Sequence, residues 1–225
     1  MNPKLFAIIP AAGVGSRMGF ETPKQYAVIG KKTVLEHSID KLLKVSAISK
    51  IFVGVSPDDA FYPSLSVDSR VQFYSGGSER ADTVRLGLEH LPEDSWVLVH
   101  DAARPFVDSS DIERLIASCL TKNCPGLLAI PATDTIKQSS DTNVKTLDRN
   151  TIWFAQTPQM APVVQLRLAL QQAQSQSLTV TDEASALELQ GEDPLLCSAN
   201  KSNIKLTDSH DWMIGQLIAK KQGLL

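Results

Sequence analysis

Short, almost continuous apolar runs alternate along this chain with stretches whose apolar residues recur at helical spacing. We expect the runs to be strands, and they cover residues 5–10, 50–56, 70–74, 96–101 and 126–131. Strands that are apolar on both faces are typical of a parallel sheet with helices on each side. Their alternation with helices predicts an α/β fold with a doubly wound, mostly parallel sheet.

The stretches between the strands carry helix start signals. In residues 33–45 the apolar side chains fall on one helical stripe, and Thr33 and Glu36 match a capping box. Residues 78–91 predict a helix with Ser78 as its N-cap, and residues 109–120 predict another. Further along, the pattern predicts three helices and one short strand, at 162–174, 181–190, 208–222 and 194–199 respectively.

One polar, β-leaning stretch, residues 131–159, interrupts the alternation. Its pattern predicts a β-hairpin with strands at "TIKQ" and "VKTLDR" around a turn at "SSDTN". A hairpin of this kind is poorly stable alone, so we expect it to pack on something, and a partner subunit is a natural candidate. We therefore predict a single domain over residues 1–225 with a protruding arm at about 133–156.

The overall composition narrows the function classes. The 225 residues include 22 Lys and Arg against 25 Asp and Glu, a formal net charge of −3. A general nucleic-acid or membrane-surface binder normally carries a basic patch, so we expect neither activity. The three cysteines, Cys119, Cys124 and Cys197, match neither a zinc site nor an even-numbered disulfide framework. Since we see no signal peptide and no membrane span, we expect a cytoplasmic protein.

Ligands of doubly wound sheets lie beyond the carboxyl ends of the strands, where the strand order reverses. The first predicted strand ends at Pro10, where the stretch "AAGVGSRMG" begins. Its glycine spacing fits neither the P-loop nor the dinucleotide-binding fingerprint. Small residues nevertheless let a bound group approach the backbone, and Arg17 and Lys24 follow as phosphate-binding cations. A tight turn with two solvated cations is the alternative.

Asp101 ends the fourth predicted strand, in "HDAARP". A carboxylate at the end of an apolar strand needs a partner, because desolvation is costly. That partner is either a metal shared with phosphates or the side chain of Arg104. The neighbouring His100 is expected to support the site from behind or to be a packing residue, and not to be a catalyst.

Seven blocks then make the chain similar to a known family, and they run in the family's order: "PAAGVGSRMG…PKQY", "GGSERADTV", "VHDAARPF", "DTIK", "DRNTIWFAQTPQ", "TDEASALE" and "NIKLT". Together they resemble the 2-C-methyl-D-erythritol 4-phosphate cytidylyltransferases. The resemblance implies a Rossmann-like nucleotidyltransferase fold. It also implies transfer of CMP from CTP to methylerythritol phosphate with Mg²⁺, or Mn²⁺ as an alternative, in non-mevalonate isoprenoid biosynthesis. It further implies a homodimer in which the arm of one subunit completes the site of the other.

The resemblance also implies roles for individual residues. Arg17 and Lys24 would be catalytic, gripping the triphosphate, and Asp101 would lie at the metal. The nucleotide would be bound by Ala11, Ala12, Gly13, Gly15, Gly76, Gly77, Ser78 and Thr83. The acceptor phosphate would be bound by Arg149, Lys205, Thr135, Arg104 and Thr157. Ser78 and Ser16 depart from the residues that many relatives carry, Asp and Arg respectively, which affects one expected base contact.

The implied reaction needs no general base, since a phosphate monoester has a second pKa near 6 and is already ionised. This agrees with the lack of a Ser/His/Asp arrangement or paired carboxylates in the sequence. Three alternatives stay open: the same transfer to ribitol 5-phosphate or another alditol phosphate, a non-catalytic nucleotide-binding regulator, and a dehydrogenase. The dehydrogenase lacks the required glycine spacing, and the regulator would not require cations for both phosphates.

Overall fold

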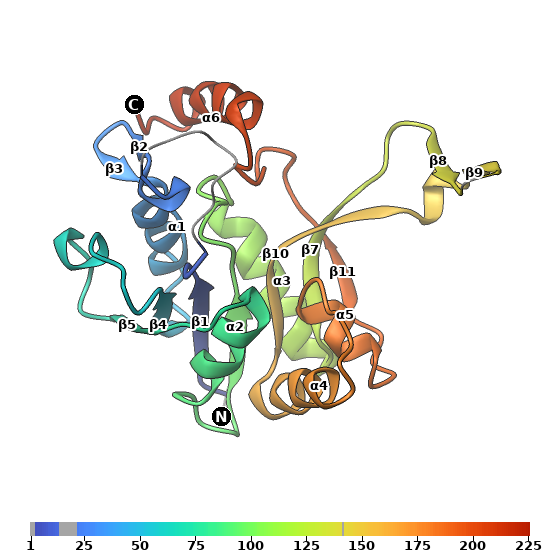
Figure 1. Ribbon diagram of the computed structural model, residues 1–225, viewed down its shortest axis with the longest axis horizontal. Coiled ribbons are helices and arrows are strands. Elements are labelled where there is room, and N and C mark those ends of the chain that lie inside the picture. The colour runs from blue at the N-terminus through green and yellow to red at the C-terminus, as the bar shows by residue number, and fades with distance from the viewer. Residues whose placement is uncertain (1–2, 14–21, 141) are drawn as a thin grey trace.

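A seven-stranded sheet forms the centre of the molecule in the computed structural model, which describes residues 3–13, 22–140 and 142–225 (Figure 1). Its strands are β1 (Leu5–Pro10), β4 (Ile48–Val55), β5 (Val71–Ser75), β6 (Trp96–Val99), β7 (Gly126–Pro131), β10 (Trp153–Pro162) and β11 (Leu195–Ser198). They lie in the order β11-β7-β10-β6-β1-β4-β5. Only β10 runs antiparallel to its neighbours within this sheet, so the predicted α/β fold with a mostly parallel sheet is confirmed.

Helices cover both faces of the sheet. Side chains of α1 (Val34–Leu43) and α3 (Ser109–Lys122) belong to one buried cluster. Those of α2 (Arg80–Leu88), α4 (Val163–Ser175) and α5 (Glu183–Glu188) belong to a second. Along β1, Ala7 and Ile9 join the first cluster, whereas Phe6 and Ile8 join the second. The continuous apolar run of this strand therefore reflects burial on both faces, as predicted.

A third, smaller cluster lies beside the sheet. It joins the hairpin of β2 (Val28–Ile29) and β3 (Lys32–Thr33) to α6 (Ser209–Lys221), through residues that include Ile29, Phe106 and Ala219. Short 3-10 turns occur at η2 (Lys24–Tyr26), η3 (Tyr62–Ser64) and η4 (Arg149–Thr151). Among the described helices, none is long and apolar enough to cross a membrane.

The predicted hairpin is present as an arm that extends well away from the body, at the upper right of Figure 1. Its strands are β8 (Ile136–Ser139) and β9 (Val144–Leu147). The arm leaves the sheet after Pro131 and returns at Trp153, which pair with each other across β7 and β10. The predicted arm bound of about 156 therefore lies within the sheet, because residues 153–156 already belong to β10.

Two local predictions are wrong. The stretch 131–159 was expected to be hairpin only, but its second part forms β10 in the middle of the sheet. Ser78 was expected to cap α2, but the helix begins at Arg80 and its N-cap is Glu79, which makes no side-chain cap bond. The Ser78 hydroxyl instead donates to Asp82 Oδ2 at 3.1 Å. The Thr33–Glu36 capping box of α1 is confirmed.

Candidate functional site

A cavity lies where the strand order of the sheet reverses, which is the usual ligand position in doubly wound sheets. The chain adds β4 and β5 on one side of β1 and then β6 on the other, so the order reverses at β1. A cavity of about 300 Å³ opens beyond the carboxyl ends of β1 and β6. Its lining comprises Pro10, Ala11, Ala12, Gly13, Lys24, Gln25, Gly77, Ser78, Glu79, Arg80, Thr83, Asp101, Ala102, Ala103 and Lys205.

The first wall of the cavity is the start of the glycine loop. The Ala11 N–H donates to Gly54 O at 2.7 Å, which ties the loop to the neighbouring strand. The buried Gln25 amide then donates to Ala11 O and Gly13 O, both at 3.0 Å. The small side chains leave room, and Gln25 determines the direction of the backbone carbonyls.

The second wall is the turn between β5 and α2. The Gly77 N–H donates to Thr83 Oγ1 at 3.1 Å. A Cβ atom at Gly76 would lie 2.7 Å from the Ala12 Cβ, and one at Gly77 would lie 2.4 Å from the Asp82 Cβ. Only glycine fits at these positions, because the turn packs directly against the loop that follows β1 and against its own helix.

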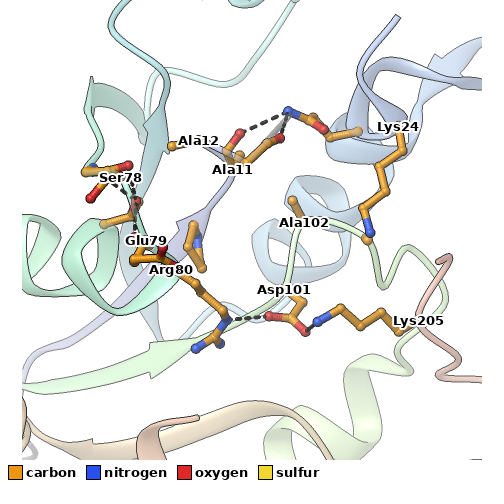
Figure 2. A pocket seen from close by; sticks show the side chains of 15 residues that line it. Ala11, Ala12, Lys24, Ser78, Glu79, Arg80, Asp101, Ala102 and Lys205 are labelled. Atoms are coloured by element: carbon orange, nitrogen blue, oxygen red, sulfur yellow. Dashed lines mark hydrogen bonds and ion pairs between the residues drawn. The ribbon is translucent and has the colours of Figure 1, made fainter. Parts of the chain in front are cut away.

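Asp101 is the buried carboxylate of the cavity, and cations surround it. Its Oδ1 accepts from Arg80 Nε at 2.9 Å, and its Oδ2 lies 2.8 Å from Lys205 Nζ. Figure 2 shows the carboxylate between these two side chains. Arg104 Nε is 3.7 Å from Oδ2. The ion pair with Arg104, considered above as the alternative to a metal, is thus present but is the longest of the three.

These charges act on one another strongly. Burial alone would raise the pKa of Asp101, but the Arg80 and Lys205 cations outweigh it and hold that pKa well below its usual range. Burial alone would likewise lower the pKa of Arg80, but the Glu183 and Asp101 carboxylates raise it. Asp101 is therefore ionised and Arg80 charged at neutral pH.

Arg80 is held from behind by α5. Its Nη1 and Nη2 donate to the two carboxylate oxygens of Glu183 at 2.7 and 3.1 Å, in a bidentate arrangement. The Glu183 side chain is only 3% exposed, so this pair is largely removed from water. Asp182 caps the same helix through a capping box with Ser185. Both acids are therefore structural, and Glu183 also supports the cavity.

The segment after β11 closes the cavity on its other side. Its Leu206 N–H donates to Ala103 O at 2.9 Å, and Leu206 O accepts from Lys24 Nζ at 3.2 Å. Lys24 and Lys205 thus approach the same cavity from opposite ends of the chain. We expect two such cations to attract a polyanion.

His100 and Thr157 lie beneath the cavity floor. Both are buried, and the Thr157 hydroxyl lies 3.0 Å from His100 Nδ1 and accepts from the Asp101 N–H at 3.0 Å. Burial lowers the pKa of His100 to about 4. His100 is therefore neutral at neutral pH, and it does not line the cavity.

The predicted site residues fall into four groups. Gly76, Arg104 and Thr157 are next to residues of the cavity but do not line it. The cavity brings together Ala11, Ala12, Gly13, Lys24, Gly77, Ser78, Thr83, Asp101 and Lys205. Thr135 and Arg149 are exposed on the arm, where Arg149 Nη1 donates to Thr133 O at 2.9 Å. Gly15, Ser16 and Arg17 lie outside the described residues. Sequence reasoning did not single out Gln25 and Arg80, although both stand inside quoted motifs.

The arrangement can bind a polyanion. Three cations, Lys24, Arg80 and Lys205, line one cavity with small residues and a single buried carboxylate. Across the described ranges there is no group of three or more His, Cys, Asp or Glu side chains that could hold a metal ion. Any metal here would need most of its ligands from water and from a bound phosphate.

Comparison with known proteins gives a consistent result. The family model described as 2-C-methyl-D-erythritol 4-phosphate cytidylyltransferase (IspD) matches residues 5–221. The chain is 45% identical over 214 residues to the enzyme of that name from Serratia proteamaculans, covering 93% of this chain and 91% of the relative. It is 43% identical over 227 residues to one from Haemophilus influenzae, covering all of both chains.

Solved structures agree. The chain superimposes on a crystal structure of 4-diphosphocytidyl-2C-methyl-D-erythritol synthase with a TM-score of 0.83 and 36% identity, covering 97% of this chain and 99% of that one. The Francisella tularensis 2-C-methyl-D-erythritol 4-phosphate cytidylyltransferase gives a TM-score of 0.81, also at 36% identity, with coverage of 96% and 99%.

Proposed function

The chain belongs to the 2-C-methyl-D-erythritol 4-phosphate cytidylyltransferase family, and from this premise we propose how its cavity carries out the family's reaction. It is a nucleotidyltransferase that transfers CMP from CTP to 2-C-methyl-D-erythritol 4-phosphate in non-mevalonate isoprenoid biosynthesis. The products are 4-CDP-2-C-methyl-D-erythritol and pyrophosphate. The observation that supports the mechanism best is the group of cations around Asp101, at the carboxyl ends of β1 and β6.

The chemistry is an in-line displacement. An oxygen of the acceptor phosphate attacks the α-phosphorus of CTP, the bond from that phosphorus to the bridging oxygen breaks, and pyrophosphate leaves. The attacking oxygen is already ionised near neutral pH, because a phosphate monoester has a second pKa of about 6. His100 is not needed as a base, and both of its ring nitrogens already have partners. The enzyme's task is to position two anions and to neutralise the charge that develops between them.

Lys24 and Lys205 lie on different sides of the cavity, so we assign each of them to a different substrate. Lys24 lies beside the loop that follows β1 and would hold the triphosphate. Lys205 lies across the cavity and would face the acceptor phosphate, with Arg104 behind it, where Nη1 donates to Asn203 O at 2.7 Å. Backbone groups of the glycine loop and of the turn at Gly77 would bind the nucleotide. Arg17 is assigned to the triphosphate by the resemblance alone, since it lies outside the described residues.

The residues present fit a magnesium ion that is held mainly by the substrate. Mg²⁺ is commonly bound by one or two carboxylates together with substrate phosphates and water. Asp101 supplies one such carboxylate, and the pKa of its side chain is low enough to keep it ionised. When bound, the metal would neutralise charge on the phosphates. The Asp101 side chain would hold it, with Mn²⁺ as an alternative ion.

The arm supports a proposal about assembly. Thr135 and Arg149 are exposed on the arm, which extends away from the body of its own subunit (Figure 1). A two-stranded hairpin is marginally stable alone, so a surface on another subunit would stabilise it. We therefore infer a homodimer in which each arm brings Thr135 and Arg149 to the partner's acceptor site. We further expect the enzyme to work in the cytoplasm, with CTP and methylerythritol phosphate as its partners.

Pyrophosphate release tests this function directly. The purified protein is incubated with CTP and Mg²⁺, and methylerythritol phosphate and ribitol 5-phosphate are offered in separate reactions. We expect release with methylerythritol phosphate. Release with ribitol 5-phosphate alone would keep the chemistry and reject the acceptor. Binding of CTP without release in either reaction would favour a nucleotide-binding regulator.

A further inference from the structure

The loop between β4 and β5 anchors the short turn η2, which stands at the edge of the cavity. The Tyr26 hydroxyl donates to Asp59 Oδ2 at 2.6 Å. The other oxygen of the same carboxylate, Oδ1, accepts from the Phe61 N–H at 2.8 Å and from the Tyr62 N–H at 3.2 Å. The Asp59 side chain therefore orders its own loop and binds Tyr26 at the same time.

Aromatic packing holds Tyr26 against the same loop. Its ring stacks on the ring of Phe61, with the two centroids 5.0 Å apart and an interplanar angle of 25°. Tyr26 is only 6% exposed and belongs to the buried cluster that also contains side chains of α1 and α3. Burial and the neighbouring Asp59 carboxylate both raise the pKa of Tyr26, so its hydroxyl keeps the hydrogen that it donates.

The turn η2 connects this anchor to the cavity. The Ala27 N–H donates to Lys24 O at 3.2 Å, which keeps the turn compact. The other two residues of η2, Lys24 and Gln25, both line the cavity. A displacement of Tyr26 would therefore move the ammonium group proposed to hold the triphosphate. It would also move the Gln25 amide that bonds to the loop after β1.

The same strand holds the glycine loop at both sides. Before the loop, the Ala11 N–H donates to Gly54 O, in β4, at 2.7 Å. After the loop, Tyr26 donates to Asp59, which lies just beyond the end of β4. Binding costs less when the groups that contact a ligand are ordered in advance. The anchor at Asp59 should therefore contribute to the affinity for the ligand of this loop.

Resting on the proposed function, we propose that Asp59 and Tyr26 are positioning residues, whose hydrogen bond holds η2 so that its cation faces the triphosphate of CTP. Neither side chain lines the cavity, and Asp59 lies outside the seven sequence blocks that carry the family resemblance. The pair acts on CTP and not on the acceptor. The reason is that η2 lies beside the loop after β1, whereas Lys205 lies across the cavity.

Binding of CTP in the absence of acceptor tests the pair. Tyr26→Phe keeps the ring that stacks on Phe61 and removes only the hydroxyl. We expect about a fivefold loss of CTP affinity, which corresponds to one hydrogen bond, measured by calorimetric titration in magnesium buffer. The KM for methylerythritol phosphate at saturating CTP should not change. Tyr62→Phe is the matched control, because it removes a hydroxyl from a ring of the same loop that packs on Phe73.

Variants of Asp59 approach the same bond from its other side, in case Tyr26→Phe does not fold. Asp59→Ala removes the acceptor, so it should lose at least as much CTP affinity as Tyr26→Phe. Asp59→Asn should retain most of the affinity, because its oxygen can accept from the loop and its amide can donate to the Tyr26 oxygen. Combining Tyr26→Phe with Asp59→Ala should cost no more than Asp59→Ala alone, since both changes break the same bond.

Three results would overturn the proposal. Wild-type CTP affinity in Tyr26→Phe and in Asp59→Ala would mean that the bond does not place η2. An equal loss in Tyr62→Phe would mean that general loosening of the loop explains the effect. A parallel rise of the KM for methylerythritol phosphate would mean that the pair supports the whole cavity. Wild-type turnover is measured alongside. Its absence would reject the proposed function, whereas the CTP affinities test the anchor independently.

Discussion

Lys205 Nζ lies 2.8 Å from Asp101 Oδ2, so a residue near the end of the chain closes a cavity built by its first half. The second oxygen of the same carboxylate faces Arg80. Asp101 therefore holds two cations from separate elements at fixed positions before any substrate binds. Such preorganisation is effective in catalysis because the charges need not be rearranged as the reaction proceeds.

Asp101→Asn keeps the shape of this side chain and removes its charge. Arg80 and Lys205 lose the group that places them, and a bound metal would lose the carboxylate proposed to hold it. We expect turnover to fall by on the order of 10²–10³, as for the loss of one preorganised charge-stabilising group. Pyrophosphate release at saturating CTP measures it, with the exposed Asp94→Asn as a control. Near wild-type turnover of Asp101→Asn would show that the carboxylate does not matter to the chemistry.

Asp211 makes the stability of the segment after Lys205 depend on pH. Burial raises the pKa of Asp211, but bonds from the Thr207 hydroxyl, Thr207 N–H and Asp208 N–H outweigh it, so the pKa lies below its usual value. A carboxylate whose pKa is depressed by folding contributes stability that is present above its unfolded pKa of about 3.9. That stability is lost as the pH falls through the folded pKa.

Asp211→Asn should therefore lower the free energy of unfolding near neutral pH by about 1 kcal/mol, because the bonds that Thr207 and Asp208 donate to the charged carboxylate are weakened. The difference from the wild type should shrink as the pH drops below about 3.9. Urea unfolding at a series of pH values measures both quantities. The exposed Asp58→Asn variant should show no such trend. A difference that stays constant with pH would contradict the explanation.

The arm can be tested by mixing subunits. If Arg149 acts in the partner's site, Arg149→Ala and Lys205→Ala each inactivate a homodimer, but a mixed dimer retains one site with both residues intact. We expect the mixture to recover activity that neither variant has alone, measured as pyrophosphate release after subunit exchange. No recovery, in a mixture shown to contain mixed dimers, would place Arg149 in its own subunit's site or outside both.

Much of the fold follows from local pattern. β1 and β7 have the bounds that their apolar runs predict, because burial on both faces leaves no polar residue to blur the signal. β10 escapes the pattern because it buries polar side chains whose partners lie elsewhere. Gln159, for example, bonds to Asp182 and to the Ala184 N–H. The local sequence does not show that such polar residues have hydrogen-bond partners in distant segments. Their polar character therefore predicts an exposed position.

The site shows the same limit. The position of Asp101 at the end of a predicted strand is enough to predict that it belongs to the site. The small residues after β1 are enough to predict that this loop approaches a ligand. Arg80 stands in a quoted motif, yet its role depends on Glu183, a distant residue that looks like an ordinary helix N-terminal acid. The sequence alone therefore indicates which charged side chains are available, but only the folded structure shows that Arg80 pairs with Glu183.

Gln25 offers a test of the glycine loop that leaves the cations untouched. Its amide donates to Ala11 O and Gly13 O at 3.0 Å each, and the residue is only 5% exposed. Because a peptide unit is planar and trans, fixing the Ala11 carbonyl also fixes the direction of the Ala12 N–H. We expect Gln25 to orient backbone donors toward the nucleotide.

Gln25→Glu replaces the donor with a group that can only accept, placed against two carbonyl oxygens. Gln25→Met removes the donor without adding charge. We expect both variants to raise the KM for CTP, by about tenfold for methionine and more for glutamate, with little change in the acceptor KM. The exposed Gln72→Glu variant controls for the added charge. Parallel increases in both KM values would mean that the loop positions more than the nucleotide, and a wild-type KM in Gln25→Glu would mean that these two bonds do not order the loop.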